Sequence, residues 1–160
     1  MGCDIHCYIE YHDGHDRWSG FGGRINPGRD YQLFGLLAGV RGAMPPLIPP
    51  RGMPTDAGYS ANHDNELAVA TSQYPDGTDS DKAAEWVANG VSKWARKGFV
   101  THPDWHTHSW LTLDEFERVL TAYYVPTGQT VSPQYCAVRE AMRELAKGYG
   151  AARLVFWFDN

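Results

Sequence analysis

Two strand-like segments, one near each end of the chain, constrain the fold more than any other feature of the sequence. Residues 3–11 alternate between apolar and polar side chains, and this period of two predicts a strand with one face in a core. Residues 153–158 (RLVFWF) form a run that is typical of a buried strand. We expect the two segments to pair as neighbours. Because an independent sheet usually needs at least about three strands, residues 18–25 and 99–101 are expected to add weaker ones.

Four other segments have helical periodicity and recognisable caps. They cover residues 31–41, a stretch from Ser80 or Asp81 to Gly98, the residues after Thr112, and the residues from Pro133 to just before Gly148. The third carries a capping box, because Thr112 and Glu115 stand in the pattern T-x-x-E. Between the first two lies a stretch rich in Pro, Gly and Asp, residues 43–79, without clear periodicity. A stretch of that length inside a compact domain is typically functional or mobile.

These elements predict a single α+β domain over residues 1–160. It should contain a small β-sheet with both terminal strands, about four packed helices and a long Pro/Gly-rich loop. The length of 160 residues suits one domain, since domains average on the order of 150 residues. Hydrophobic residues make up 42% of the chain, which is enough for a core and argues against a wholly disordered protein.

The charge of the chain bears on its partners. Lys and Arg number 14 and Asp and Glu 19, which gives a formal net charge of −5. This balance argues against a protein that coats nucleic acid, because binding to the phosphate backbone depends on Lys and Arg. No apolar run approaches the roughly 20 residues of a membrane helix, and the first residues lack the pattern of a signal peptide. With three cysteines and no secretory signal, we expect a cytoplasmic protein without a membrane partner.

Two short motifs could hold a metal ion. Asp4 and His6 stand two residues apart on the first predicted strand, and His106 and His108 have the same spacing ahead of the third helix. Residues i and i+2 of an extended chain point to the same side. Two such pairs that face each other would supply the nitrogen and oxygen ligands of a divalent metal ion, zinc or manganese, with one position open for water. A water molecule on such a metal is the nucleophile of many hydrolases.

The same four residues also have a purely structural interpretation. Asp4 could be an edge-strand carboxylate that accepts a backbone hydrogen bond, and His6 a packed histidine that is bonded to a neighbour. His106 and His108, which lie between two tryptophans, could belong to a rigid surface loop. Buried polar groups need partners, and those partners are often other polar side chains.

Three residues are candidates for binding a phosphate group. Ser109 and Trp110 lead into the N-terminus of the third helix, where free amides and the helix dipole favour an anion. Arg51 lies between prolines in the segment PPRGMP, and a guanidinium on a stiff loop is suited to gripping phosphate. The alternatives are ordinary helix capping and a surface arginine on a turn.

The leading functional hypothesis is a metal-dependent hydrolase that acts on a small phosphorylated or nucleotide-like substrate. Glu10, His63 or Asp64 would serve as the general base in phosphodiesterase-type chemistry. The second hypothesis is a non-catalytic protein that binds and sequesters such a ligand. The third is an interaction protein whose metal is structural.

Five sequence blocks resemble a family of small, uncharacterised phage and bacterial proteins that begin GCDIH. The blocks are MGCDIH at residues 1–6, RDYxLF at 29–34, PRG at 50–52, HTHSWLT at 106–112 and VFWFDN at 155–160. The blocks occur in this order and are distributed from one end of the chain to the other. The phage association implies a role in the cytoplasm of an infected host, directed against immunity based on nucleotide signalling.

Overall fold

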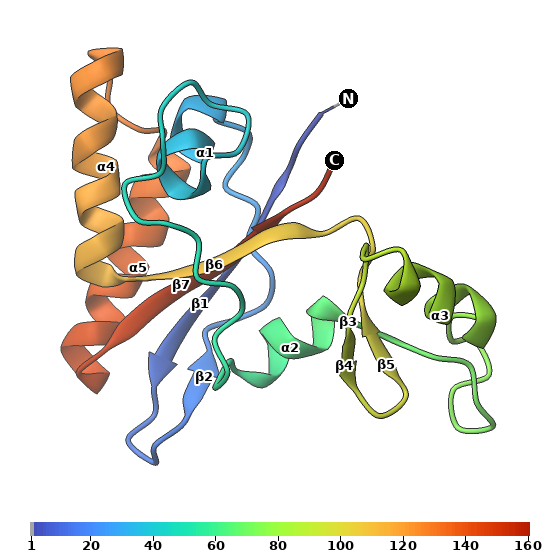
Figure 1. The fold of residues 1–160 in the computed structure, drawn as a ribbon. Coiled ribbons are helices and arrows are strands. Elements are labelled where there is room, and N and C mark those ends of the chain that lie inside the picture. The colour runs from blue at the N-terminus through green and yellow to red at the C-terminus, as the bar shows by residue number, and fades with distance from the viewer. Residues whose placement is uncertain (1) are drawn as a thin grey trace.

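The two ends of the chain lie side by side in the larger of two antiparallel sheets (Figure 1). In the computed structural model, which describes residues 2–160, strand β1 (Ile5–His12) pairs with strand β7 (Ala152–Phe158), and Ile5 lies opposite Phe158. Strand β2 (Trp18–Gly20) extends the sheet beyond β1, and strand β6 (His106–Thr112) extends it beyond β7. This main sheet therefore has the order β2-β1-β7-β6, which confirms that the terminal strands are neighbours.

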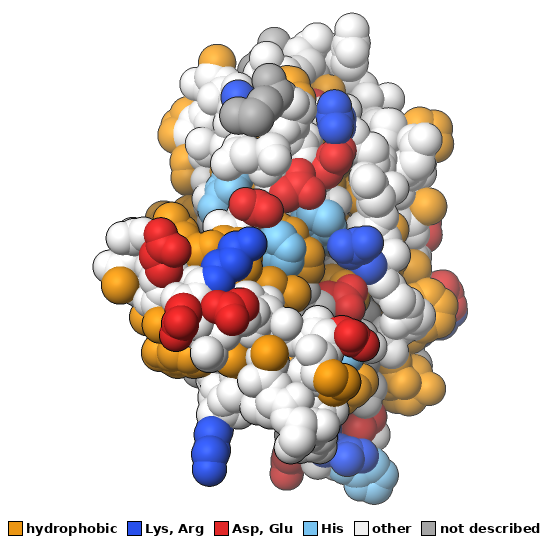
Figure 2. All heavy atoms as spheres, turned by 90° about the vertical axis from the view of Figure 1, so that its right-hand side faces the viewer, with side chains coloured by type: hydrophobic (Ala, Val, Ile, Leu, Met, Phe, Trp, Pro, Cys, Tyr) orange, Lys and Arg blue, Asp and Glu red, His pale blue; other side chains and the backbone are white. Residues whose placement is uncertain are grey.

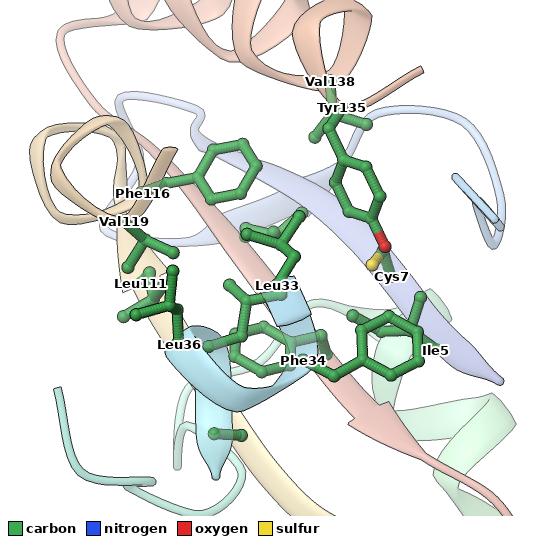
Figure 3. Packing of buried hydrophobic residues seen from close by; sticks show 14 of the residues in the cluster. Ile5, Cys7, Leu33, Phe34, Leu36, Leu111, Phe116, Val119, Tyr135 and Val138 are labelled. Carbon is green, nitrogen blue, oxygen red and sulfur yellow. The ribbon is translucent and has the colours of Figure 1, made fainter. Parts of the chain in front are cut away.

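Three helices cover one face of the main sheet: α1 (Tyr31–Ala38), α4 (Leu113–Thr127) and α5 (Pro133–Tyr149). Alternate residues of β1 and β7 point into this layer, as the period of two predicts. Figure 3 shows side chains from all three helices that converge on those strands. The fully buried members of this core include Ile5, Cys7, Leu154, Phe156 and Phe158 from the strands and Leu33, Phe34, Phe116 and Tyr135 from the helices.

The opposite face of the main sheet has a smaller core of its own. Tyr8, Val155 and Trp157 are buried there against Ala61 of the short helix α2 (Tyr59–Asn65). The ring of Trp157 is at the centre of an aromatic cluster, because His6, Tyr8, Trp105 and His108 all pack against it with ring centroids between 5.2 and 6.2 Å away. This face carries most of the residues that the sequence singled out.

A second, small sheet projects from this side of the molecule, at the right of Figure 1. It contains β3 (Glu66–Ala68), β5 (Phe99–Thr101) and β4 (Trp94–Arg96) in the order β3-β5-β4. Helix α3 (Ser80–Ala88) packs on it, and Val69, Ala83 and Val100 form a separate buried cluster. The molecule is therefore an α+β fold, as predicted, with a second sheet that the sequence did not indicate beyond residues 99–101.

The second predicted helix is wrong in its C-terminal half. The helix is capped by Asp79 and ends at Ala88, because Gly90 adopts the left-handed conformation at φ 74°. The chain then turns back, and Trp94 lies in β4 instead of on a helical face. A tight hairpin at Gly98, where φ is 78°, pairs β4 with β5. The residues that continue the helical spacing therefore form a strand.

Three smaller boundaries also differ from the prediction. Helix α1 ends earlier than expected, because Gly39 rather than Gly42 takes the left-handed capping position. Helix α5 runs through Gly148 and is closed by Gly150. The long stretch of residues 43–79 contains α2 and β3, so part of it is regular structure.

Candidate functional site

A cleft of about 780 Å³ lies between the main sheet and the small sheet. We call it the inter-sheet cleft. Ligand pockets commonly have volumes of about 300–1,000 Å³, so this one is large enough for a small molecule. Figure 2 views the molecule from the side of the small sheet, and histidine side chains gather midway down this face among acidic and basic ones. The lining residues that bear on its chemistry are Asn65, Lys93, Trp94, Trp105, His106 and His108.

A β-bulge in β6 sets the directions of the two histidines. His106 pairs with Phe158 and Ser109 with Phe156, so β6 has one more residue than β7 over this interval. Thr107 absorbs the irregularity with a positive φ of 52°. As a result, the ring of His106 lies beside that of Phe158, with 6.2 Å between the ring centroids. The ring of His108 packs instead on Trp157, with 5.4 Å between the centroids. The regular alternation that the sequence argument assumed is absent here, yet both histidines line the inter-sheet cleft.

His108 is a largely buried, neutral histidine. Its Nε2–H donates a hydrogen bond to Oδ1 of Asn65 over 2.7 Å. Burial, assisted by the nearby charges of His106 and Lys93, lowers the pKa of His108 to about 4. At neutral pH the ring therefore carries one proton, on Nε2, and its Nδ1 is a hydrogen-bond acceptor.

His106 has a ring nitrogen without a partner. Its Nδ1 is 2.8 Å from the hydroxyl oxygen of Thr107, but its Nε2 is buried and makes no hydrogen bond to any described residue. A buried polar atom that is left unpaired costs about 1–3 kcal/mol. This nitrogen is enclosed by protein, so it does not itself face the cleft, although His106 is one of the lining residues.

Lys93 supplies the positive charge of the inter-sheet cleft. Its backbone N–H donates to the hydroxyl of Thr101 over 3.0 Å, which fixes the residue at the edge of the small sheet. Its ammonium group forms no ion pair with the described residues, and its charge acts on His108. The neighbouring Trp94 also lines the cleft and is 51% exposed, so one face of its ring is accessible.

The predicted metal ligands on β1 are already engaged with other side chains. Both carboxylate oxygens of Asp4 accept hydrogen bonds from Arg29, over 2.6 and 2.9 Å, and these bonds hold the pKa of Asp4 below its usual range. His6 donates from Nε2 to Asp159 over 2.7 Å and accepts at Nδ1 from Arg24 over 3.2 Å. A metal ion would have to displace these partners.

Residues 2–160 contain no group of three His, Cys, Asp or Glu side chains that could hold a metal ion together. The four predicted ligands therefore do not form a ready-made coordination shell in this arrangement. The bulge of β6 and the ion pairs of β1 are the physical reasons. The metal remains a prediction from sequence.

The predicted phosphate-binding residues form a structural contact beside the cleft. The guanidinium of Arg51 makes a bidentate ion pair with Glu115, lowers the pKa of that carboxyl and lies 4.6 Å from the ring centre of Trp110. The Ser109 hydroxyl accepts the Arg51 backbone N–H over 3.2 Å, and Ser109 is buried. These contacts hold the PRG segment against β6.

Glu10, the first candidate base, belongs to a buried ion pair. Its carboxylate accepts a hydrogen bond from Arg153 over 2.8 Å and another from the backbone N–H of Gly58 over 2.7 Å. Arg153 also binds Asp56 over 2.8 Å, and its guanidinium lies 4.0 Å from the ring centre of Trp18. Since Glu10 and Arg153 are 1% and 3% exposed, this network anchors the segment before α2 rather than facing a ligand.

The other two candidate bases lie on α2. Asp64 accepts a hydrogen bond from the hydroxyl of Tyr8, whose pKa is raised mainly by burial and also by this bond. His63 is exposed and lies beside the ring of Tyr59, with its Nδ1 3.5 Å from Asp64. In the described chain neither residue lines the inter-sheet cleft.

Asn65, Lys93 and Trp94 were missed by the sequence argument. Asn65 ends a short helix inside a stretch that has no periodicity, and Lys93 and Trp94 were assigned to a helix. These residues come together only through the small sheet. The one local signal, a lysine next to a tryptophan, is too common to identify a site.

Comparisons with protein-family models, with curated proteins and with solved structures find no match for this chain. Within residues 2–160, no helix is both long enough and apolar enough to cross a membrane. The functional argument therefore depends on the geometry of the inter-sheet cleft.

Proposed function

We propose that the protein binds a small phosphorylated or nucleotide-like molecule in the inter-sheet cleft. The observation that carries this proposal is the ammonium of Lys93, which forms no ion pair with the described residues and belongs to a residue that lines the inter-sheet cleft. A lysine ammonium is a compact positive charge that binds phosphate well.

The remainder of the lining fits a ligand with a ring. Amide and hydroxyl side chains of Asn62, Thr55 and Thr101 supply neutral hydrogen-bonding groups. The exposed face of Trp94 can stack on a base or another planar ring, an interaction worth about 1–3 kcal/mol. The lining also contains one carboxylate, Glu66, which is paired with Arg96 over 2.7 Å. The combination of the unpaired Lys93, neutral polar groups and the exposed Trp94 is suited to a mononucleotide-sized molecule.

Calorimetric titration tests this proposal with matched lysine variants. Inorganic phosphate, ribose 5-phosphate and the four common ribonucleoside monophosphates are the probes. We expect at least one organic phosphate to bind, with an affinity that falls about tenfold or more in Lys93→Met and decreases with added salt. Lys97→Met is the control, because Lys97 is also exposed but does not line the cleft. If no probe binds, or if both variants weaken binding equally, the proposal is wrong.

Hydrolysis is the second candidate, because the His106 side chain is among the residues that line the cleft. A histidine ring near the ligand can transfer a proton close to neutral pH. We infer that a cleaved ligand would place its reacting phosphoester next to the ring of His106. The protein is incubated with cyclic nucleotides and dinucleotides, and the ligand is then released from it and analysed by chromatography. Recovery of intact ligand indicates sequestration. Cleavage products that are absent with His106→Gln support hydrolysis.

The divalent metal, zinc or manganese, is tested separately. Elemental analysis of the purified protein and of the His6→Ala and His108→Ala variants measures it directly. If metal is present in the wild type and is lost in a variant that remains folded, the predicted site is supported. A metal-free and active wild type contradicts it. The proposed binding function does not depend on the result.

A further inference from the structure

The end of helix α2 holds the ring of His108 in one orientation. Oδ1 of Asn65 accepts the Nε2–H of His108 over 2.7 Å. Asn65 is 7% exposed, and its backbone carbonyl accepts the N–H of His102 over 3.3 Å. The preceding residue, Asp64, is bonded to Tyr8 of β1, so α2 is tied to the main sheet at two successive positions. The amide that faces His108 therefore has a fixed place.

This contact determines which nitrogen of His108 is free to accept a hydrogen bond. Since Nε2 carries the proton, Nδ1 carries the lone pair. The imidazole ring of His108 also packs on the ring of Trp157, which restricts its rotation. Nδ1 has no hydrogen-bond partner among the described residues and, unlike Nε2 of His106, is not enclosed. The inter-sheet cleft thus has an acceptor in a fixed position.

We propose that His108 is a specificity-determining residue of the inter-sheet cleft, with Nδ1 accepting a hydrogen bond from an N–H or O–H of the ligand, and that Asn65 is the residue that positions it. This inference rests on the proposed function. The ligand class is a phosphorylated molecule that also carries a donor, such as a nucleotide whose base presents an imino or amino N–H.

The charges in the cleft place the two parts of such a ligand. A phosphate oxygen is itself an acceptor, so it is disfavoured opposite Nδ1 of His108 and favoured beside Lys93. The donor of the ligand then lies at His108. Sites that hydrogen-bond a donor discriminate strongly against analogues that lack it, because the acceptor is left without a partner.

Nuclear magnetic resonance tests the positioning role without any ligand. Long-range nitrogen–carbon correlation in labelled protein at pH 7 distinguishes the protonated from the unprotonated ring nitrogen. We expect His108 to be protonated only at Nε2 in the wild type and to show a mixture of both tautomers in Asn65→Leu. Asn26→Leu is the control, because Asn26 lies outside the cleft lining and bonds only Gly28. A proton on Nδ1 in the wild type overturns the inference.

Binding of methylated nucleotides tests the specificity role. Uridine 5′-monophosphate and guanosine 5′-monophosphate are compared with their N3-methyl and N1-methyl derivatives, which lack the imino N–H. For whichever parent binds, methylation should weaken binding about tenfold or more in the wild type and have little effect in His108→Phe or Asn65→Leu. Equal binding of parent and derivative to the wild type overturns this inference alone. No binding by any phosphorylated probe overturns the proposed function as well.

Discussion

At the scale of single residues, the Arg153–Glu10 pair shows how a charge is buried on the face of the main sheet opposite helices α1, α4 and α5. Arg153 lies on the last strand and Glu10 on the first, and neither contacts solvent appreciably. Two hydrogen bonds to protein donors satisfy the carboxylate, and a tryptophan ring covers the guanidinium. Such a pair adds little net stability compared with apolar side chains, but removing one partner leaves an isolated charge.

The first prediction concerns this pair. Arg153→Met should lower the free energy of unfolding by about 3–5 kcal/mol, because Glu10 is then buried without its counter-ion. Urea denaturation measures the loss. Asp56→Asn is the matched control and should cost less than about 1 kcal/mol, since that side chain is 62% exposed. A small effect of Arg153→Met would show that Glu10 is accessible to water after all.

The second prediction follows from His108. Its pKa is about 4 in the folded protein and ordinarily 6.5. As the pH falls below 6.5, the unfolded chain takes up a proton that the folded protein does not. The free energy of unfolding therefore decreases between pH 6.5 and 4, by up to about 3 kcal/mol, and this effect is absent above pH 6.5.

Urea denaturation at pH 7 and pH 5 measures that contribution. In His108→Gln the loss of stability between the two pH values should be about 2 kcal/mol smaller than in the wild type. His63→Gln should behave like the wild type, because His63 is exposed on α2. Identical pH dependence in all three proteins would contradict a buried, neutral His108.

At the scale of secondary structure elements, local sequence signals are reliable where the controlling contacts are also local. The capping box that Thr112 and Glu115 predict is present at the start of α4, where each side chain accepts the backbone N–H of the other residue. Asp30 likewise caps α1. At the end of α3 two local signals conflict, because Gly90 is a helix-stop residue while the apolar spacing continues beyond it. Trp94 continues the helical spacing, but the pairing of β4 with β5 places it in a strand.

The capping box gives the third prediction. Thr112→Ala should lower the free energy of unfolding by about 1 kcal/mol, because an amide at the start of α4 loses its acceptor. The control is Thr121→Ala in the same helix, whose hydroxyl only donates to the carbonyl of Glu117. That change should be nearly neutral or slightly stabilising, because alanine is the better helix former. Thermal or urea unfolding of the two variants measures the contrast.

At the scale of the whole molecule, the inter-sheet cleft lies between two sheets that have separate buried clusters. The main sheet is buried on both faces, whereas the small sheet is supported by a cluster around Val69, Ala83 and Val100. The site residues come from three segments that are far apart in the sequence, around 65, 93 and 106–108. Their meeting depends on the position of the small sheet, which no local pattern encodes. This is why the fold class was predictable and the cleft was not.

The fourth prediction concerns this division. Val100→Ala should destabilise the small sheet by about 2 kcal/mol through loss of buried methyl groups. Hydrogen exchange should then accelerate by about tenfold or more in β3, β4 and β5, while the amides of β1 and β7 keep their protection. Binding in the inter-sheet cleft should weaken in parallel. Equal acceleration in both sheets would show that the molecule unfolds as one unit.

The pairing of β1 with β7 has a consequence for the order of events on the ribosome. β7 lies between β1 and β6 in the main sheet, yet it is synthesised after both. Until it emerges, β1 and β6 have no strand to join them. Contacts this distant in sequence also close slowly. β1 can pair early with β2, but the edge of β1 that receives β7 must stay unpaired until β7 has been made, and an open strand edge is prone to aggregation.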